Sequence, residues 1–382
     1  MKKENLEKII ALRHQLHQNP ELSLQERETQ KRIRRFLADN TALEIVGREG
    51  WFYAVKKGSD PNAEPIAFRA DMDALPMHES IDLPHASVNE GVSHKCGHDG
   101  HCAALCGLAL ELDQAEMTRT VYFIFQPAEE IGAGGKVCAG LIREKGIQEI
   151  FAFHNLGGFP EGSIVYRKGL TQPASEGMEI RFVGKTSHAS APEKGRNPSE
   201  VISKVVLYVN ELLEKTYRGM VLCTVTGIQV GTGDFGVSPG EGTLRLTLRA
   251  EYEAELDALK RKIQEYTNQL SRESGILAEY SYFDYFPETK NSDPGIERVL
   301  AAANKLQIPA IEMPDLWRAS EDFGYYLKEC EGAMFYIGNG ENWPALHTAE
   351  YDFNDRILET AVPFLRQLAV DHAVLSPVRT HQ

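Results

Sequence analysis

A short turn at residues 94–101 concentrates side chains that bind transition metals. It reads His-Lys-Cys-Gly-His-Asp-Gly-His, so Cys96 and His98 lie two positions apart. Thiolate and imidazole are donors that Zn²⁺ and its first-row neighbours favour in proteins. The alternative is a loop whose histidine caps the next helix and whose cysteine packs in the core. The residue types favour a pair of metal ligands over that alternative.

A second segment, Gln-Pro-Ala-Glu-Glu at residues 126–130, places two carboxylates side by side. Glu129 and Glu130 repel each other unless a positive charge lies near them. A metal supplies that charge, so one carboxylate can bind the ion while the other accepts a proton from a metal-bound water. Acidic turns in solvent are common, so the pair by itself is weak evidence.

Two isolated histidines complete a candidate ligand set. His154 follows an apolar run of strand length, and His347 lies in the segment Ala-Leu-His-Thr. A lone histidine is more often structural, so the argument rests on the set. Together with Cys96, His98 and Glu130 they offer five ligands, which exceeds the needs of one tetrahedral ion and suits two ions sharing a bridging ligand. These ligand types leave zinc, manganese, cobalt and nickel open.

Apolar runs predict the strands that would position these residues. Residues 66–68, 121–125 and 150–153 are such runs, and each leads into ionisable side chains. Residues 66–68 lead into Asp71 and Asp73. Residues 121–125 lead into Glu129 and Glu130, and residues 150–153 lead into His154. Helices are expected near residues 4–18, 25–37, 101–113 and 136–145. Strands that alternate with helices predict an α/β fold with a largely parallel sheet, where function gathers past the carboxyl ends of the strands.

The pattern changes near residue 177 and predicts a second domain. Residues 177–286 read as strand, helix, two strands, helix and strand, which is typical of a small α+β unit. We expect this unit to be inserted between catalytic segments 1–176 and 287–382. A chain of 382 residues suits two domains. The tail at residues 376–382 is expected to be a frayed end.

Composition excludes several classes of protein. The net charge of −14 argues against a nucleic-acid partner, whose phosphates require a basic face. The start of the sequence has no apolar signal region, and no apolar run reaches the roughly 20 residues that span a bilayer. The six cysteines are irregularly spaced, as is typical of reduced thiols. We therefore expect a cytoplasmic protein without a membrane partner.

Five segments occur in the order found in the amidohydrolase branch of metallopeptidase family 20, which the chain resembles over nearly its whole length. They are residues 12–23, 69–76, 94–101, 126–130 and 320–323. That branch includes bacterial N-acyl-amino-acid amidohydrolases, hippurate hydrolases, aminobenzoyl-glutamate hydrolases and plant indole-acetyl-amino-acid hydrolases. The resemblance implies a zinc-peptidase-like catalytic domain with a mostly parallel mixed sheet. It also implies that the insertion is a ferredoxin-like satellite domain for dimerisation or closure, and hence a homodimer.

The resemblance also implies roles for individual residues. Cys96 matches a thiolate ligand that can bridge two divalent ions, and Glu129 matches the general base. Asp73 matches an aspartate that supports the metal centre. His188, in the smaller domain, matches a histidine that polarises the scissile carbonyl, sometimes from the partner subunit. The remaining ligands match His98, Glu130, His154 and His347.

The substrate side departs from the family pattern. Where family members often carry an asparagine that helps to hold the substrate carboxylate, this chain has Gly236. Arg245 and Arg249 are candidate partners for that carboxylate, because a guanidinium binds a carboxylate with two parallel hydrogen bonds. An ordinary arginine on the surface of a strand is an equally good interpretation of either residue.

These observations predict a metal-dependent amidohydrolase that cleaves N-acyl amino acids or similar small amides with metal-activated water. One alternative is a carboxypeptidase or dipeptidase of the same family. The cysteine in the turn at residues 94–101 favours the amidohydrolase branch over it. The other is a non-catalytic, metal-dependent binding protein, which the intact set of ligands and base disfavours.

Overall fold

The computed structural model describes residues 1–371, which form two compact units. Unit 1 comprises Met1–Thr171, Thr289–Leu316 and the described residues from Asp322 onward. Unit 2 comprises Gln172–Glu288 and the short segment Trp317–Glu321. The insertion expected at residues 177–286 falls within unit 2. The tail at residues 376–382, expected to be frayed, lies outside the described residues.

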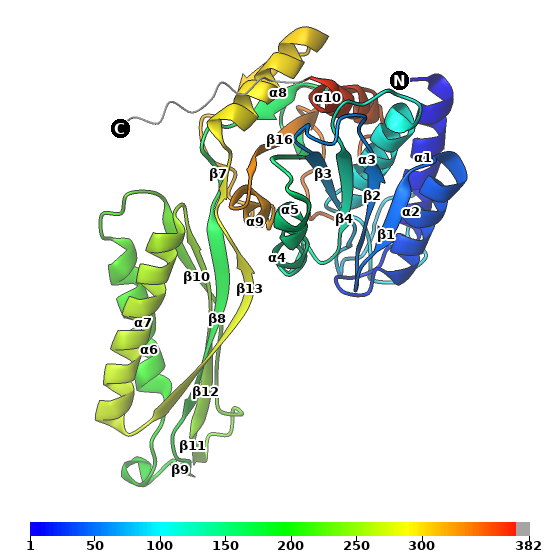
Figure 1. Ribbon diagram of the computed structural model, residues 1–382. Helices are drawn as coiled ribbons and strands as arrows, with labels where there is room; N and C mark the ends of the chain where they lie inside the picture. The colour runs from blue at the N-terminus through cyan, green and yellow to red at the C-terminus, as the bar shows by residue number, and fades with distance from the viewer. Residues whose placement is uncertain (372–382) are drawn as a thin grey trace, which may run out of the picture. The chain divides into compact units, whose positions relative to one another are not determined.

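Unit 1 is built on a mixed, mostly parallel sheet of eight strands, whose central part is visible in Figure 1. Their order is β1-β2-β4-β3-β5-β16-β6-β15. The strands are β1 (Glu44–Gly47), β2 (Phe52–Lys56), β3 (Ile66–Asp71), β4 (Val121–Gln126), β5 (Glu149–Gly157), β6 (Ile164–Tyr166), β15 (Ala310–Glu312) and β16 (Glu331–Gly340). Strand β3 pairs in parallel with β4 and β5, and β5 with β16. The predicted sheet type is confirmed.

Helices cover both faces of this sheet. One face packs on α1 (Lys3–Gln18), α2 (Arg27–Asn40), α3 (His98–Asp113), α8 (Asp293–Leu306) and α10 (Leu358–Val370). The other packs on the short helices α4 (Gly134–Cys138), α5 (Gly140–Lys145) and α9 (Gly324–Leu327). Side chains alternate between the faces along a strand, so Phe68 joins the first core and Ala67 the second. Burial on both faces explains why these strands are continuous apolar runs.

Two local predictions were wrong. The helix expected at residues 136–145 is two short helices divided at Ala139, and Gly140, a weak helix former, begins the second. His154 was expected after its strand but lies inside β5. Strand β16 pairs with β5 along nearly its whole length, with Tyr336 opposite His154, and this extends β5 beyond the local apolar run.

Smaller elements complete unit 1. Strand β7 (Leu170–Gln172), which crosses the boundary into unit 2, pairs with β14 (Thr289–Lys290), and the 3₁₀ turn η2 (Asp355–Ile357) precedes α10. None of the helices in residues 1–371 is long and apolar enough to cross a membrane. All six cysteines are free thiols, as expected from their spacing.

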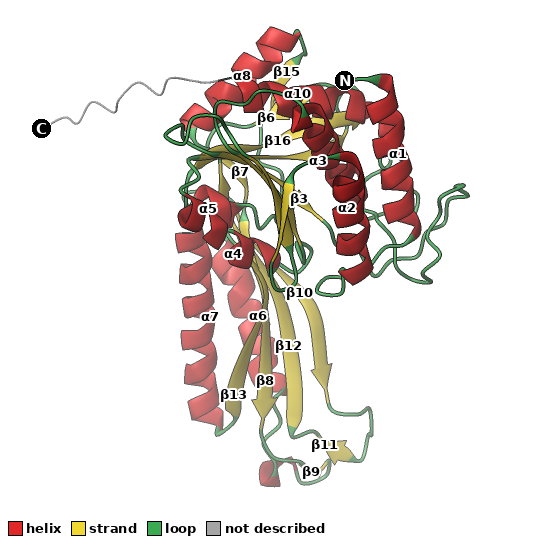
Figure 2. Ribbon diagram, turned by 45° about the vertical axis from the view of Figure 1, so that its right-hand side comes forward, coloured by secondary structure: helices red, strands yellow, loops and turns green. Residues whose placement is uncertain are grey.

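Unit 2 is a four-stranded antiparallel sheet with two helices along one face (Figure 2). The strands lie in the order β10-β12-β8-β13. Along the chain the elements are β8 (Ala174–Val183), α6 (Ser199–Leu213), β10 (Val221–Val230), β12 (Glu241–Ala250), α7 (Glu253–Ser274) and β13 (Leu277–Phe286). Alternate residues such as Ile180 and Leu246 face the helices and form the core. The predicted ferredoxin-like order of elements is confirmed.

Candidate metal centre

The three strands that were expected to precede the site residues are neighbours in unit 1, in the order β4-β3-β5. They run parallel, so their carboxyl ends meet at one edge of the sheet. Asp73 follows β3, and Glu129 and Glu130 follow β4. His154 lies near the end of β5. The edge is therefore lined with ionisable groups from three separate segments of the chain.

Five predicted ligands lie together at this edge. The Cys96 Sγ atom is 3.3 Å from Nε2 of His154 and 3.3 Å from Nε2 of His347. The Glu130 carboxylate is 3.6 Å from Nε2 of His347 and 3.8 Å from Nε2 of His98. Cys96 thus belongs to two groups of three donors, one with His98 and His154 and one with Glu130 and His347, each spanning no more than 4.8 Å. Two groups that share one sulfur fit a pair of ions with a bridging thiolate.

Hydrogen bonds orient two of these histidines for metal binding. Nδ1 of His98 donates to the carbonyl oxygen of Asp73 at 2.9 Å, and Nδ1 of His154 donates to that of Asn155 at 2.8 Å. A carbonyl oxygen only accepts, so each Nδ1 carries a hydrogen, and in the neutral ring each Nε2 keeps the lone pair that a metal would take. Within residues 1–371, Nε2 of His98 and Oε1 of Glu130 are buried atoms without a hydrogen-bond partner. Metal ions would satisfy both, so the donor set fits the implied cofactor.

The electrostatics of the cluster favour cations. Burial, followed by the charges of Glu130 and Glu129, raises the pKa of the Cys96 thiol well above its usual range. Burial raises the pKa of Glu130 to about 7. Burial would lower the pKa of His98, but Asp71, Asp73 and Glu130 outweigh it and raise that pKa to about 10. Without metal the cluster therefore retains protons, and metal binding must release them.

Asp73 holds the glutamate turn in place. Its Oδ1 accepts a hydrogen bond from the backbone N–H of Glu129 at 3.1 Å, and its Oδ2 accepts one from Glu130 at 3.0 Å. The hydroxyl of Ser23 donates to the same Oδ2 at 2.7 Å. With its oxygens used in this way, Asp73 fixes the backbone of Glu129, the expected base, and of Glu130, an expected ligand.

The junction between the turn that carries Cys96 and helix α3, which begins at His98, requires the glycine between these two residues. Gly97 has φ +98°, a left-handed conformation that glycine adopts without strain. A Cβ atom at this position would lie 2.3 Å from Oδ1 of Asn155 and 2.7 Å from the hydroxyl of Tyr351. Any side chain would therefore displace the neighbours that pack against the turn.

A buried ionic network beneath the turn was not predicted from the sequence. His17 Nδ1 contacts Asp99 at 2.8 Å, and its Nε2 contacts Glu79 at 2.8 Å. Glu79 also accepts from Lys95, the residue before Cys96. Residues 12–23 matched the family pattern, but no property of the sequence indicated which partners their side chains would meet.

His17 should make the stability of the protein depend on pH. Burial opposes its charge, but hydrogen bonds with Asp99 and Glu79 outweigh this and raise its pKa from 6.5 to about 9. The charged form is therefore favoured by folding. This stabilisation, on the order of 3 kcal/mol at most, is complete below the unfolded pKa and is lost as the pH rises towards 9. We expect the difference in unfolding free energy between wild type and His17→Gln to shrink between these two pH values.

Urea unfolding of the metal-loaded protein at both pH values measures this difference. Gln15→Ala, which removes an exposed side chain without a titratable group from the same helix, is the control and should show no such change. If His17→Gln lowered the unfolding free energy equally at both pH values, a charged His17 would not be the source of the pH dependence.

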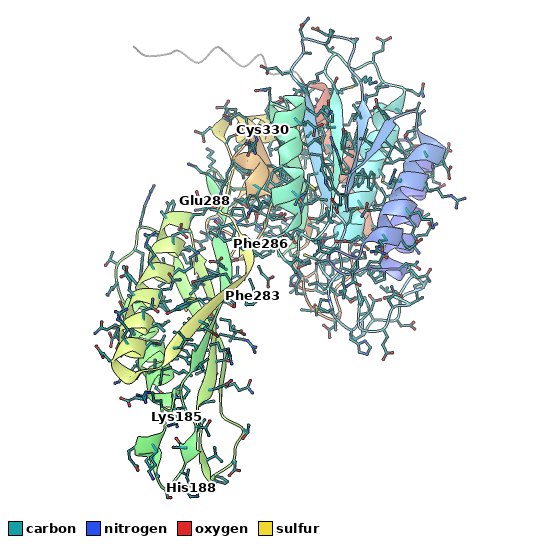
Figure 3. The ribbon with its side chains drawn as sticks, turned by 60° about the horizontal axis from the view of Figure 1, so that its bottom comes forward. Lys185, His188, Phe283, Phe286, Glu288 and Cys330 are labelled. Carbon is teal, nitrogen blue, oxygen red and sulfur yellow. The ribbon has the colours of Figure 1, made fainter. Side chains whose placement is uncertain are left out.

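His188 lies in unit 2, at the end of the sheet where β9 (Ser187–His188) pairs with β11 (Val237–Ser238) (Figure 3). The 3₁₀ turn η1 (Pro192–Lys194) follows it. The backbone N–H of Ser190 donates to Nδ1 of His188 at 3.1 Å. An amide only donates, so Nδ1 carries the lone pair and Nε2 carries the hydrogen in the neutral ring. His188 can therefore donate a hydrogen bond through Nε2.

The candidate substrate contacts also lie in unit 2. Gly236 is exposed, and its N–H donates to Oδ1 of Asp234 at 2.7 Å. Arg245 is largely exposed and forms an ion pair with Glu179 at 2.6 Å. Arg249 is more buried and donates to the Ser320 hydroxyl at 2.7 Å. Burial lowers the pKa of Arg249. Of the two arginines, Arg245 already has a carboxylate partner.

Comparison with known proteins identifies the family of the chain. Residues 67–371 match the model of peptidase family M20/M25/M40. The chain is 31% identical over 373 residues to N-acetylcysteine deacetylase of Bacillus subtilis (strain 168), covering 95% of this chain and 96% of that protein. It is 28% identical over 371 residues to hippurate hydrolase of Campylobacter jejuni, covering 94% and 95%.

A solved structure is similar to this chain over nearly its whole length. The crystal structure of a dinuclear metal-binding peptidase of the M20 family from Bacillus subtilis matches with a TM-score of 0.82 at 30% identity. The match covers 97% of this chain and 98% of that one. The fold, the family model and the relatives agree, and the chain belongs to the amidohydrolase branch of the M20 family of hydrolases.

Proposed function

We propose that this chain hydrolyses the amide bond of N-acyl amino acids, or of similar small amides, to a carboxylic acid and a free amine. The observation that carries the proposal is the position of Cys96 in two groups of metal donors beside Glu129. The names of the relatives, a deacetylase and a hippurate hydrolase, support an N-acyl amino acid as substrate.

Two divalent ions per subunit would be held by Cys96 and by the four ligands named with it, His98, Glu130, His154 and His347. Zinc and manganese are the first choices, and cobalt and nickel share the same ligand preferences. When bound, such ions lower the pKa of a water molecule towards neutrality and polarise the scissile carbonyl. The thiol of Cys96 must lose its proton before it can bind them.

Glu129 acts as the general base in this proposal. Its backbone is held by Asp73, and its carboxylate lies 3.8 Å from Nε2 of His98, beside the ligand cluster. From there it takes the proton of the attacking water and delivers it to the nitrogen of the leaving amine. His188 donates a hydrogen bond from Nε2 to the carbonyl oxygen as negative charge develops there. A homodimer formed through unit 2 could supply this histidine from the partner subunit.

A second candidate is a dipeptidase or carboxypeptidase, because the matching crystal structure is described as a peptidase. Both activities use the same water and base and differ in the group on the acyl side. A non-catalytic binding protein is the weakest alternative, since every ligand and the base are present in the chain.

A hydrolysis screen tests the proposal. Chelator-stripped and metal-reloaded protein would be assayed with acetyl-, benzoyl-, indole-acetyl- and aminobenzoyl-amino acids and with dipeptides, with released amine as the readout. We expect N-acyl amino acids to be cleaved, activity to vanish on stripping, and activity to return with one of the candidate metals. Cleavage of dipeptides alone would establish the second candidate. No cleavage by protein with two bound metals would refute the catalytic proposal.

A further inference from the structure

The glutamate turn begins with a strained residue. Ala128 has φ +52°, a left-handed conformation that is uncommon for residues other than glycine. Such strain persists only where the surroundings enforce it. The carbonyl oxygen of Ala128 accepts hydrogen bonds from the amides of Ala133 and Gly134, which closes the turn on one side. The amide of Ala128 must be held on the other side.

Glu26 provides that contact. Its Oε1 accepts a hydrogen bond from the backbone N–H of Ala128 at 2.8 Å, across 102 positions of sequence. The side chain of Glu26 is only 2% exposed. Burial, and then the charge of Asp73, raises its pKa to about 7, so the carboxyl is held in an unfavourable place. Burying a carboxyl group costs free energy unless a hydrogen bond compensates for it. The hydrogen bond from Ala128 provides such compensation, which indicates that this contact stabilises the turn.

Three consecutive amides are thus held by two carboxyl groups. Glu26 accepts from Ala128, while Asp73 accepts from Glu129 and Glu130. Together these bonds fix the orientation of every peptide plane in the segment that carries the proposed base and a proposed ligand. A rotation at Ala128 would redirect the side chain of Glu129, because the two residues share a peptide bond.

Glu26 does not serve its own helix. It precedes the first residue of α2, but its side chain makes no capping hydrogen bond to that helix. The carboxylate of Glu21 accepts from the amide of Thr29 in the first turn at 2.7 Å. Glu21 and Glu26 therefore have separate tasks, which allows them to be tested separately.

We propose that Glu26 is a positioning residue for catalysis: by holding the Ala128 amide, it keeps the turn in the left-handed conformation that directs Glu129 towards the reacting water. The inference rests on the proposed function for its effect on turnover. Its structural part, the hold on the turn, stands independently of any substrate.

Two variants of similar volume separate the hydrogen bond from packing. Glu26→Met fills the site without an acceptor, whereas Glu26→Gln keeps a carbonyl oxygen that can accept from Ala128. Hydrogen exchange of the peptide covering residues 126–134, bound metal, kcat and KM would be measured at saturating metal. In E26M we expect faster exchange and a kcat about 10–100-fold lower, with KM little changed, as for other outer partners of metal sites. E26Q should restore protection and most of kcat.

Glu21→Ala is the matched control, because it loosens the start of the same helix without touching the turn. It should leave exchange at residues 126–134 and kcat unchanged. Unchanged exchange and kcat in E26M, or equal losses in E21A and E26M, would overturn the inference. If the wild type cleaves no amide, the proposed function fails while hydrogen exchange still tests the hold on the turn. Should E26M not fold, Glu26→Ala removes the acceptor without adding bulk and gives the same comparison.

Discussion

Replacing Glu129 by glutamine should lower kcat about 10²–10⁴-fold while both metal ions stay bound. The amide has the size of the carboxylate but cannot take a proton from water at neutral pH. Glu129 is placed by a hydrogen bond from its backbone N–H to Asp73, which the substitution leaves intact. The fold of the turn should therefore survive, and the loss should appear in kcat with little change in KM.

The adjacent glutamate provides the comparison for this experiment. Glu130 belongs to the donor group with Cys96 and His347, so Glu130→Gln should lower metal content as well as activity. Metal analysis of both purified variants, with kcat measured at saturating metal, distinguishes a base from a ligand. Substantial activity in Glu129→Gln, or loss of metal from it, would refute the assignment of Glu129 as the base.

Replacing Cys96 by serine should release metal and abolish most activity. The thiol sulfur is the one donor shared by the two ligand groups, and it lies 3.3 Å from a histidine nitrogen in each. A serine hydroxyl is a poor ligand for zinc-like ions compared with a thiolate. We expect metal affinity to fall by more than the roughly 10–100-fold typical of losing an outer hydrogen bond.

Cys106→Ala is the matched control, because Cys106 is a fully buried cysteine of unit 1 that packs in the apolar core of α3. This variant should lose some stability but keep two metals and normal turnover. Titration with a chelator, followed by metal analysis, measures both variants. Two tightly bound ions in Cys96→Ser would contradict a bridging role for the thiol.

Much of the architecture could be predicted because its causes are local. Apolar runs such as residues 121–125 indicate strands, and helical spacing indicates α1 near its observed bounds. The repeating order of strands and helices distinguishes the two units before any contact is known. The donor atoms of Cys96 and His98 also identify the chemistry of a metal site from residue type alone.

Other features depend on contacts between distant segments, which periodicity does not reveal. His154 was expected beyond its strand, and only pairing with β16 extends β5 past it. The ring orientation of His98 depends on the carbonyl of Asp73, and the need for Gly97 depends on Asn155. Each of these features requires two distant segments of the chain to come into contact in the folded protein.

The sequence by itself determined the fold class, the family pattern and the kinds of donor atoms, because apolar periodicity and side-chain chemistry are properties of each segment. Only the tertiary structure decided how the donors are aimed and held. The hold of Glu26 on Ala128 joins residues 102 positions apart, and the two donor groups that share Cys96 draw on separate segments of the chain. Such contacts arise when the sheet brings strand ends together, and that juxtaposition is a property of the folded chain.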